Sequence, residues 1–142
     1  MAVPMPTSAR SRSRSAARLA AVQALYQQEM EKTPVPVLLH EFHHHRLGQR
    51  IEDVEYADAE VDFFDDIVRG VDARSDELDG LTEGKLASGW SLARLDKPMR
   101  QILRAGAYEL VARIDVPTAS VISEYVDVAK AFYDKKEAAF VN

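Results

Sequence analysis

Cysteine is absent from this sequence, and its absence excludes several kinds of chemistry. Without thiols the chain has no disulfides, thiolate metal sites or cysteine nucleophiles, which suits a reducing compartment. No apolar run approaches the roughly 20 residues that a membrane-spanning helix needs. The N-terminal arginines are not followed by the apolar block of about 7–15 residues that marks a secretory signal. We therefore expect a soluble, cytoplasmic protein that does not contact a membrane.

Signals for β-structure are also scarce. Little of the sequence alternates between apolar and polar residues, and no Asn-Gly or Asp-Gly pair separates two apolar runs. A length of 142 residues, with 46% hydrophobic and 29% charged residues, is ordinary for one soluble globular domain. The sequence therefore predicts a single compact all-α unit.

Acidic residues are missing from the first part of the chain. Residues 1–28 hold four arginines and no acid, a charge of +4, whereas residues 29–142 hold 14 basic and 23 acidic residues, a charge of -9. A basic segment on an acidic body can bind phosphate locally while the body resists non-specific contact with nucleic acid. A solvated, disordered tail is the alternative interpretation.

The first helix is predicted to begin at about Ser15, among several alanines. Its apolar residues recur at spacings of three and four and form one stripe: Leu19, Val22, Tyr26 and Met30. We expect Arg14 and Arg18 to be held against the folded body, and Arg10 and Arg12 to be flexible.

The middle of the chain also predicts helices joined by short connectors. The prolines of "KTPVP" end the first helix, and "VPVLLHEFHHHRLG" predicts a second one that ends near Gly48. A third begins at about Asp58 and has Gly70 as a weak point; a fourth covers residues 74–85 and could merge with the third. The apolar residues expected on the third helix are Val61, Phe64, Val68 and Val71.

The segment "DKPMRQILRAGAYELVARI" is the most informative helix. Asp96 is placed to cap it, and Pro98 suits its first turn. Glycine inside a helix costs roughly 1 kcal/mol relative to alanine, so Gly106 indicates a closely packed neighbouring helix. The expected apolar stripe consists of Met99, Ile102, Leu103, Gly106, Leu110 and Ile114.

The neighbour of that helix is predicted to begin near Pro117. Its polar residues fall on the opposite face, and the two helices should form the core of the bundle. The apolar face consists of Val121, Ile122, Tyr125, Val126, Ala129, Phe132 and Tyr133.

Several segments occur in an order known from one family. These are "AVQALYQ", "WSLARLDKPMRQILRAGAYEL", "DVPTASVISEYVDVAKAF" and the final "FVN". In these segments the chain resembles the bacterial Nus factor B (NusB) family from about Arg14 to Asn142, most weakly over residues 32–57. The last two segments form one block, and the three ordered blocks with matching separations make the resemblance specific.

The resemblance implies an all-α fold of about six to seven helices in two small subdomains. It implies a flexible arm over residues 1–14, a NusB-like domain over residues 15–142, and neither enzymatic activity nor a cofactor. The implied ligand is boxA-type single-stranded RNA, bound together with the ribosomal protein NusE. The implied setting is an elongation complex with other Nus factors and RNA polymerase, and family members are monomers or homodimers.

The resemblance also suggests which residues contact the RNA, because an arginine-rich N-terminal segment does so in the family. Guanidinium groups contact phosphate and stack on bases. Arg14 and Arg18 match best by position, whereas Arg10 and Arg12 match in character. The "AVQALYQ" block adds two further candidates, Gln23 and Tyr26, although Tyr26 also fits a core position.

The C-terminal segment places basic and aromatic residues together. Phe132, Lys135 and Lys136 are expected to extend the RNA surface, with a solvated turn as the alternative. Here the chain departs from the family: this loop is commonly acidic or neutral and here reads "YDKKE". The helix that usually follows "FVN" is also missing, so the closing helix is expected to be truncated.

Other chemistry has little support. His40 and His44 are spaced to bind a metal, but no third ligand follows at a motif spacing. Residues 80–86, "GLTEGKL", resemble a phosphate loop only superficially, and there is no G-x-S-x-G motif. Trp90 is expected to pin a connector to the core. No catalytic or metal site is therefore predicted.

Two other interpretations of the whole chain remain open. A helical domain of this type also precedes the catalytic domain of a ribosomal RNA cytosine methyltransferase, and the chain could be that domain in isolation. It could also be a protein-interaction module whose arginines are incidental.

Overall fold

The computed structural model describes residues 7–45, 58–86, 91–133 and 140–141. Within these ranges the secondary structure is helical throughout. The helices are α1 (Thr7–Glu31), α2 (Val35–His45), α3 (Asp58–Glu83), the short 3-10 helix η1 (Leu92–Arg94), α4 (Lys97–Ala112) and α5 (Thr118–Phe132). The all-α prediction is confirmed. Five α-helices lie in the described ranges instead of the six to seven expected, partly because the predicted third and fourth helices are one.

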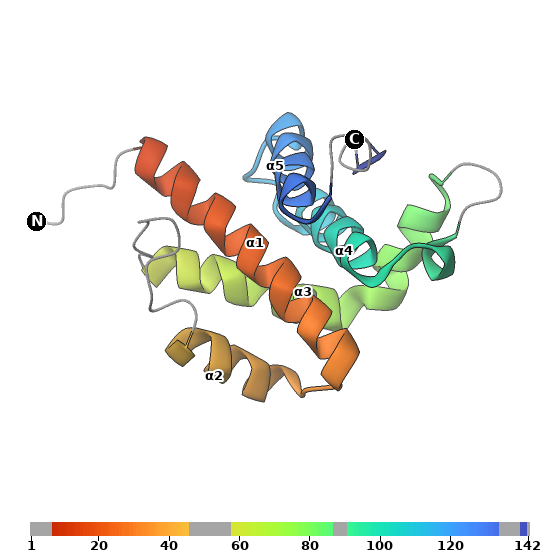
Figure 1. Ribbon diagram of the computed structural model, residues 1–142. Coiled ribbons are helices and arrows are strands. Elements are labelled where there is room, and N and C mark those ends of the chain that lie inside the picture. Colours follow the sequence, from red (N-terminus) through yellow and green to blue (C-terminus); the bar gives the residue numbers. More distant parts are fainter. Residues whose placement is uncertain (1–6, 46–57, 87–90, 134–139, 142) are drawn as a thin grey trace, which may run out of the picture.

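Helix α1 is the centre of the bundle and contacts α2, α3, α4 and α5 (Figure 1). One hydrophobic cluster includes buried side chains from all five α-helices. The division into two subdomains stays a prediction. None of the described helices is both long and apolar enough to cross a membrane.

The start of α1 corrects the sequence prediction, since the helix begins at Thr7 and not at about Ser15. Neither proline nor glycine occurs between Thr7 and Glu31, so nothing in the arginine-serine stretch breaks a helix. Arg10 and Arg12 therefore have helical backbone. The boundary predicted after residue 14 falls inside a helix. Lys32 ends α1 with a left-handed backbone (φ 58°), and its N–H donates to the carbonyl of Gln28 at 2.8 Å.

The buried face of α1 also differs from the predicted stripe. Val22 is buried, but Met30 is 52% exposed, and Leu19 and Tyr26 are half-buried. Small side chains take the core positions because α1 is surrounded by four helices and short residues allow close approach. The buried residues of α1 are Ser13, Ala17, Arg18, Ala20, Ala21, Val22, Ala24 and Leu25.

Helix α3 is continuous to Glu83 but kinked at Arg74, where φ is -120° and ψ is 20°. Gly70 is not a weak point of this helix. A Cβ atom built there would lie 2.2 Å from Cε1 of Tyr108 on α4, so glycine is what lets that ring cross α3. The close approach expected at Gly106 is absent, because a Cβ there would make ordinary contact with Tyr125 at 3.5 Å.

Helix α4 begins as predicted: the Asp96 side chain accepts the N–H of Met99 at 3.1 Å, and Pro98 lies in the first turn. The predicted apolar stripe is wrong in its second half, since Leu110 is 44% exposed and Ile114 92% exposed. The buried residues are Met99, Gln101, Ile102, Ala105, Tyr108 and Glu109. Leu110 and other apolar side chains of α4 that do not face the core line an open groove beside α5.

Helix α5 packs against α4 as expected, although its start is one residue beyond Pro117. Val121, Tyr125 and Ala129 are buried as predicted, and Val128 joins them. Phe132 and Tyr133 are half-buried and pack against the core at the end of the helix.

Candidate nucleic-acid interface

The candidate interface begins with the arginines of α1. Arg10, Arg14 and Arg18 are four residues apart, and an α-helix has 3.6 residues per turn, so their backbone positions form one row along the helix. Arg12 lies on another face. The row runs from the N-terminal end of α1 into the body of the bundle, so its members lie in different environments.

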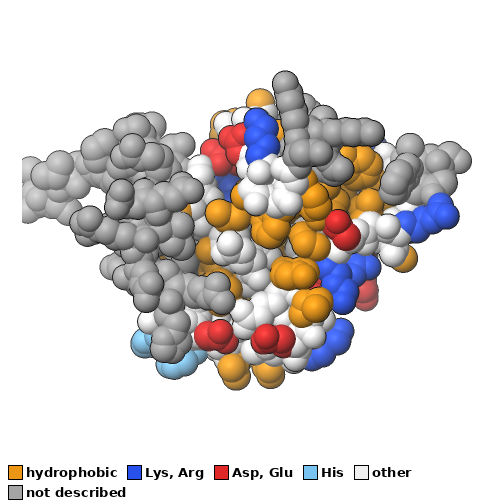
Figure 2. All heavy atoms as spheres, in the orientation of Figure 1, with side chains coloured by type: hydrophobic (Ala, Val, Ile, Leu, Met, Phe, Trp, Pro, Cys, Tyr) orange, Lys and Arg blue, Asp and Glu red, His pale blue; other side chains and the backbone are white. Residues whose placement is uncertain are grey.

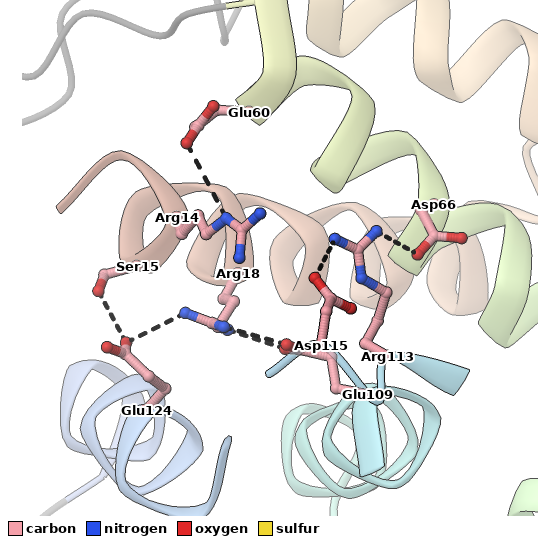
Figure 3. A network of polar contacts seen from close by, with 9 residues as sticks. All are labelled: Arg14, Ser15, Arg18, Glu60, Asp66, Glu109, Arg113, Asp115 and Glu124. Atoms are coloured by element: carbon pink, nitrogen blue, oxygen red, sulfur yellow. Dashed lines mark hydrogen bonds and ion pairs between the residues drawn. The ribbon is translucent and has the colours of Figure 1, made fainter. Parts of the chain in front are cut away.

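Arg18 is buried, with 3% of the residue exposed. Its Nε and Nη2 donate to the two carboxylate oxygens of Glu109 at 2.8 and 3.0 Å, and its Nη1 lies 3.6 Å from Glu124 (Figure 3). Burial alone would lower the pKa of Arg18, but the hydrogen bonds and charge of Glu109 outweigh it and raise the pKa. The RNA contact expected of Arg18 is therefore corrected: in this structure the side chain has almost no surface to offer a phosphate.

Arg14 lies at the edge of the bundle, with its side chain 19% exposed. Its Nε is 4.0 Å from a carboxylate oxygen of the buried Glu60, and its guanidinium lies 4.7 Å from the ring centroid of Phe63. A guanidinium over an aromatic face makes a favourable cation–π contact, which helps to hold the Arg14 side chain in place. Arg14 is the described arginine of the row that combines a fixed position with access to solvent.

Three guanidiniums surround the Phe63 ring, since those of Arg18 and Arg113 each lie 4.9 Å from its centroid. Arg113, from the end of α4, also pairs with Asp66 and Asp115, each at 3.2 Å (Figure 3). Burial raises the pKa of Asp115, but the charge of Arg113, the hydrogen bonds to this carboxylate and the charge of Arg14 together outweigh it, so the pKa is lowered. The contact between Arg113 and Asp66 was not predicted, because these residues lie 47 positions apart in the sequence.

The charges of this network do not favour an anion at its centre. The three arginines face five carboxylates: Glu60, Asp66, Glu109, Asp115 and Glu124. Carboxylates repel phosphate, so the inner part of the network is structural.

A second group of candidates lies at the other end of α1 and is more aromatic. Gln23 and Tyr26 are both half-buried, so Tyr26 is neither a full core residue nor a free surface residue. The Tyr133 hydroxyl donates to Oδ1 of Asp96. Burial, this hydrogen bond and the nearby Tyr26 all raise the pKa of Tyr133. Figure 2 shows hydrophobic side chains gathered on the viewed side of the molecule, over the C-terminal half of α1 and α4.

The predicted C-terminal candidates are only partly described. Phe132 is half-buried, and its ring lies 6.3 Å from that of Tyr133. Lys135 and Lys136 lie outside the described residues, as does Trp90. Phe140 is described and is 41% exposed.

The histidines have other partners than a metal. The rings of His40 and His44 contact each other in a tilted arrangement, with 4.2 Å between their centroids, and His43 pairs with Asp65 on α3. In the described ranges no three side chains of His, Asp or Glu are grouped to hold a metal ion. Most of the segment 80–86 is the last turn of α3 and the turn after it, so it has no strand-to-helix phosphate loop.

The fold and the site define a small all-α protein whose first helix carries a row of arginines that runs from its N-terminal end into the core. The NusB family model matches residues 15–142. The chain belongs to the NusB family. The family match begins after Arg10, Arg12 and Arg14, so it carries no information about these three residues.

Curated relatives are similar in sequence to this chain along most of their length. The transcription antitermination protein NusB of Sphingopyxis alaskensis is 68% identical over 133 residues, covering 94% of this chain and 89% of the relative. The protein of the same name from Novosphingobium aromaticivorans is 67% identical over 131 residues, covering 92% and 88%. Both bear the name of a transcription factor and not of an enzyme, in agreement with the expected lack of catalysis.

Solved structures share the fold. NusB of T. maritima superposes with a TM-score of 0.72 at 26% identity, covering 99% of this chain and 87% of that one. A protein chain in a crystal structure of a plectonemic RNA supercoil gives a TM-score of 0.76 at 25% identity, covering 92% and 88%. The solution structure of NusB from Aquifex aeolicus gives a TM-score of 0.71 at 25% identity, covering 92% of this chain and 82% of that one.

Proposed function

We propose that this protein is a transcription antitermination factor that binds boxA-type single-stranded RNA together with the ribosomal protein NusE. The observation that carries the proposal is the identity of 68% and 67% to relatives named transcription antitermination protein NusB, over nearly their whole length. The same coverage favours a NusB protein over an isolated domain of a methyltransferase.

The charge distribution supports an RNA contact at the N-terminal end of α1. The first 28 residues carry +4 on a chain with a net charge of -5. Because α1 is one helix from Thr7 to Glu31, Arg10 and Arg12 have helical backbone. A segment that is already helical loses less conformational entropy on binding than a free tail would. The proposed phosphate contacts are Arg10, Arg12 and the exposed edge of Arg14.

Arg18 has a different place in the proposal, because its guanidinium is held by Glu109. Its removal would weaken RNA binding through the fold and not through a lost phosphate contact. Gln23, Tyr26, Phe132, Lys135 and Lys136 stay candidates. Aromatic rings beside cationic groups suit stacked single-stranded bases.

The test is a fluorescence anisotropy titration of labelled boxA-like RNA at about 0.15 M salt, with and without NusE. The variant R10A/R12A should bind more weakly than the parent protein in both series. A matched control is R69A/K130A, which removes the same charge from exposed positions on α3 and α5. Equal losses in the two variants would show a general charge effect and contradict a specific contact by the arm.

The partner series tests the other half of the proposal. NusE should increase the RNA affinity of the parent protein and should still bind R10A/R12A in the absence of RNA. If the protein bound neither RNA nor NusE, the antitermination function itself would be wrong.

A further inference from the structure

The N-terminal half of α1 packs on the bundle through unusually short side chains. The buried residues between 13 and 21 are Ser13, Ala17, Arg18, Ala20 and Ala21. The larger buried side chains, Val22 and Leu25, follow only in the second half. Helices fix their relative rotation and axial position by interdigitating side chains, and a face of alanines offers little to interdigitate. Apolar packing alone therefore defines the register of this half weakly.

Arg18 supplies the missing specificity, because it is the long side chain buried in this half. Its fork of two hydrogen bonds holds Glu109 on α4, and its guanidinium also lies near Glu124 on α5 and over the ring of Phe63 on α3. One turn earlier, the Ser15 hydroxyl donates to Glu124 at 2.7 Å. A bidentate arginine–carboxylate pair tolerates little displacement, so these contacts fix both the rotation and the axial position of α1.

Stability alone does not require such a pair. Desolvation of both charges offsets much of their attraction, and well-packed apolar residues of similar volume are often neutral or stabilising replacements. The best-attested use of a buried polar pair is to select one register among several. The position of this pair, in an otherwise alanine-lined contact, is where such a selection is needed.

We propose that Arg18 and Glu109 are positioning residues that set the direction of the N-terminal half of α1 and so the place at which Arg10 and Arg12 meet RNA. The inference rests on the proposed function for its RNA part only. Arg10 lies two turns from Arg18, about 12 Å at 1.5 Å per residue. A tilt of about 10° at Arg18 would therefore move the arm by roughly 2 Å, enough to spoil contacts with phosphates.

The first experiment measures the direction of α1 without RNA. Because the chain has no cysteine, spin labels can be attached at introduced cysteines alone. The pair S11C/A73C joins the arm to α3, and the control pair E31C/S123C joins the C-terminal end of α1 to α5. In the variant R18M/E109L the first distance distribution should broaden or shift while the control distribution stays the same. An unchanged first distribution would overturn the proposal.

The second experiment measures the consequence for RNA. In the background that keeps Arg10 and Arg12, R18M/E109L should reduce RNA affinity roughly 2- to 30-fold, the range seen for substitutions that act at a distance. In the R10A/R12A background the same substitution should have almost no effect, because the arm it positions has lost its charges. Equal losses in both backgrounds would show a general structural effect and overturn the positioning role.

Two further outcomes can be told apart from failure of the proposal: a double variant that does not fold, and a parent protein that binds no RNA. If R18M/E109L fails to fold by circular dichroism, E109Q is measured in its place, because glutamine keeps the shape and one acceptor while removing the charge. Unchanged distances and unchanged RNA affinity in E109Q would overturn the proposal. If the parent protein binds no boxA-like RNA, the proposed function fails, whereas the distance measurements still decide whether the pair positions α1.

Discussion

Gly70 of α3 and Tyr108 of α4 fit together so closely that a single methyl group cannot be added between them. A Cβ at Gly70 would lie 2.2 Å from two atoms of the Tyr108 ring, and the hydroxyl of that ring is anchored to Asp66 at 2.6 Å. The ring cannot retreat without losing this hydrogen bond. The crossing of α3 and α4 therefore depends on a residue without a side chain.

The substitution G70A should lower the free energy of unfolding by about 1–3 kcal/mol, as overpacking typically does. Urea denaturation followed by circular dichroism measures it. The matched control is G106A, whose Cβ would only reach ordinary contact at 3.5 Å. G106A should be neutral or stabilising by up to about 1 kcal/mol, because alanine favours helix. The reverse order would show that the close approach lies at Gly106, as the sequence suggested.

Loss of the Arg18 guanidinium should be strongly destabilising. R18A leaves Glu109 buried without its main partner, which typically costs about 3–5 kcal/mol. The comparison is R74A, which removes an exposed arginine paired with Glu77 and should change the midpoint of thermal unfolding very little. Similar midpoints for R18A and the parent protein would contradict the buried pair.

Alkaline pH should weaken the fold through Tyr108. Burial and the hydrogen bond to Asp66 raise the pKa of Tyr108 to about 12 from its ordinary value of 10.0. A raised pKa means that the stabilisation is complete below pH 10 and is lost as the pH rises from 10 towards 12. Y108F has no hydroxyl to titrate, so its thermal midpoint should fall less than that of the parent protein between these pH values. Parallel curves would exclude Tyr108 as the cause.

The salt dependence of RNA binding should report the number of phosphate contacts. Each contact removed lowers the slope of log affinity against log salt by roughly 0.7 for single strands. R12A should therefore give a shallower line than the parent protein, whereas R69A should give a parallel one. A slope that R12A leaves unchanged would remove Arg12 from the interface.

The lysines near the C-terminus provide a further prediction from the sequence. K135E/K136E should reduce affinity for single-stranded RNA without impairing NusE binding. Charges beyond roughly 8 Å are largely screened at 0.15 M salt, so a clear loss at that concentration indicates direct phosphate contact. Parental affinity would place both lysines on a solvated turn.

The helical fold could be predicted from the sequence because its signals are local. Asp96 and Pro98 mark the start of α4, and the prolines after residue 32 end α1. The buried faces were harder to predict. On α1 and α4 the most hydrophobic residues are not always the buried ones: Met30 and Leu110 are exposed. The burial of the alanines on α1 was not predicted. The spacing of apolar residues identifies the most hydrophobic positions, but it does not show how closely the neighbouring helices approach.

The candidate site was predicted in part. The arginines could be recognised as a basic segment, but the burial of Arg18 could not, because its partner Glu109 is 91 residues away in the sequence. One signal was available: Glu109 falls one residue after Tyr108, on the side of α4 that faces the core. A charged residue at such a position indicates a buried partner of opposite charge.

Asp96 joins two elements through one oxygen atom, since its Oδ1 accepts both the N–H of Met99 in the first turn of α4 and the hydroxyl of Tyr133 just after α5. The start of one helix and the end of the other therefore share a single acceptor. A molecule that draws Tyr133 to itself removes a competitor for this oxygen and leaves it to the backbone of α4. We therefore expect a ligand bound at the end of α5 to change the amide-exchange rates in the first turn of α4, far along the chain from the contact itself.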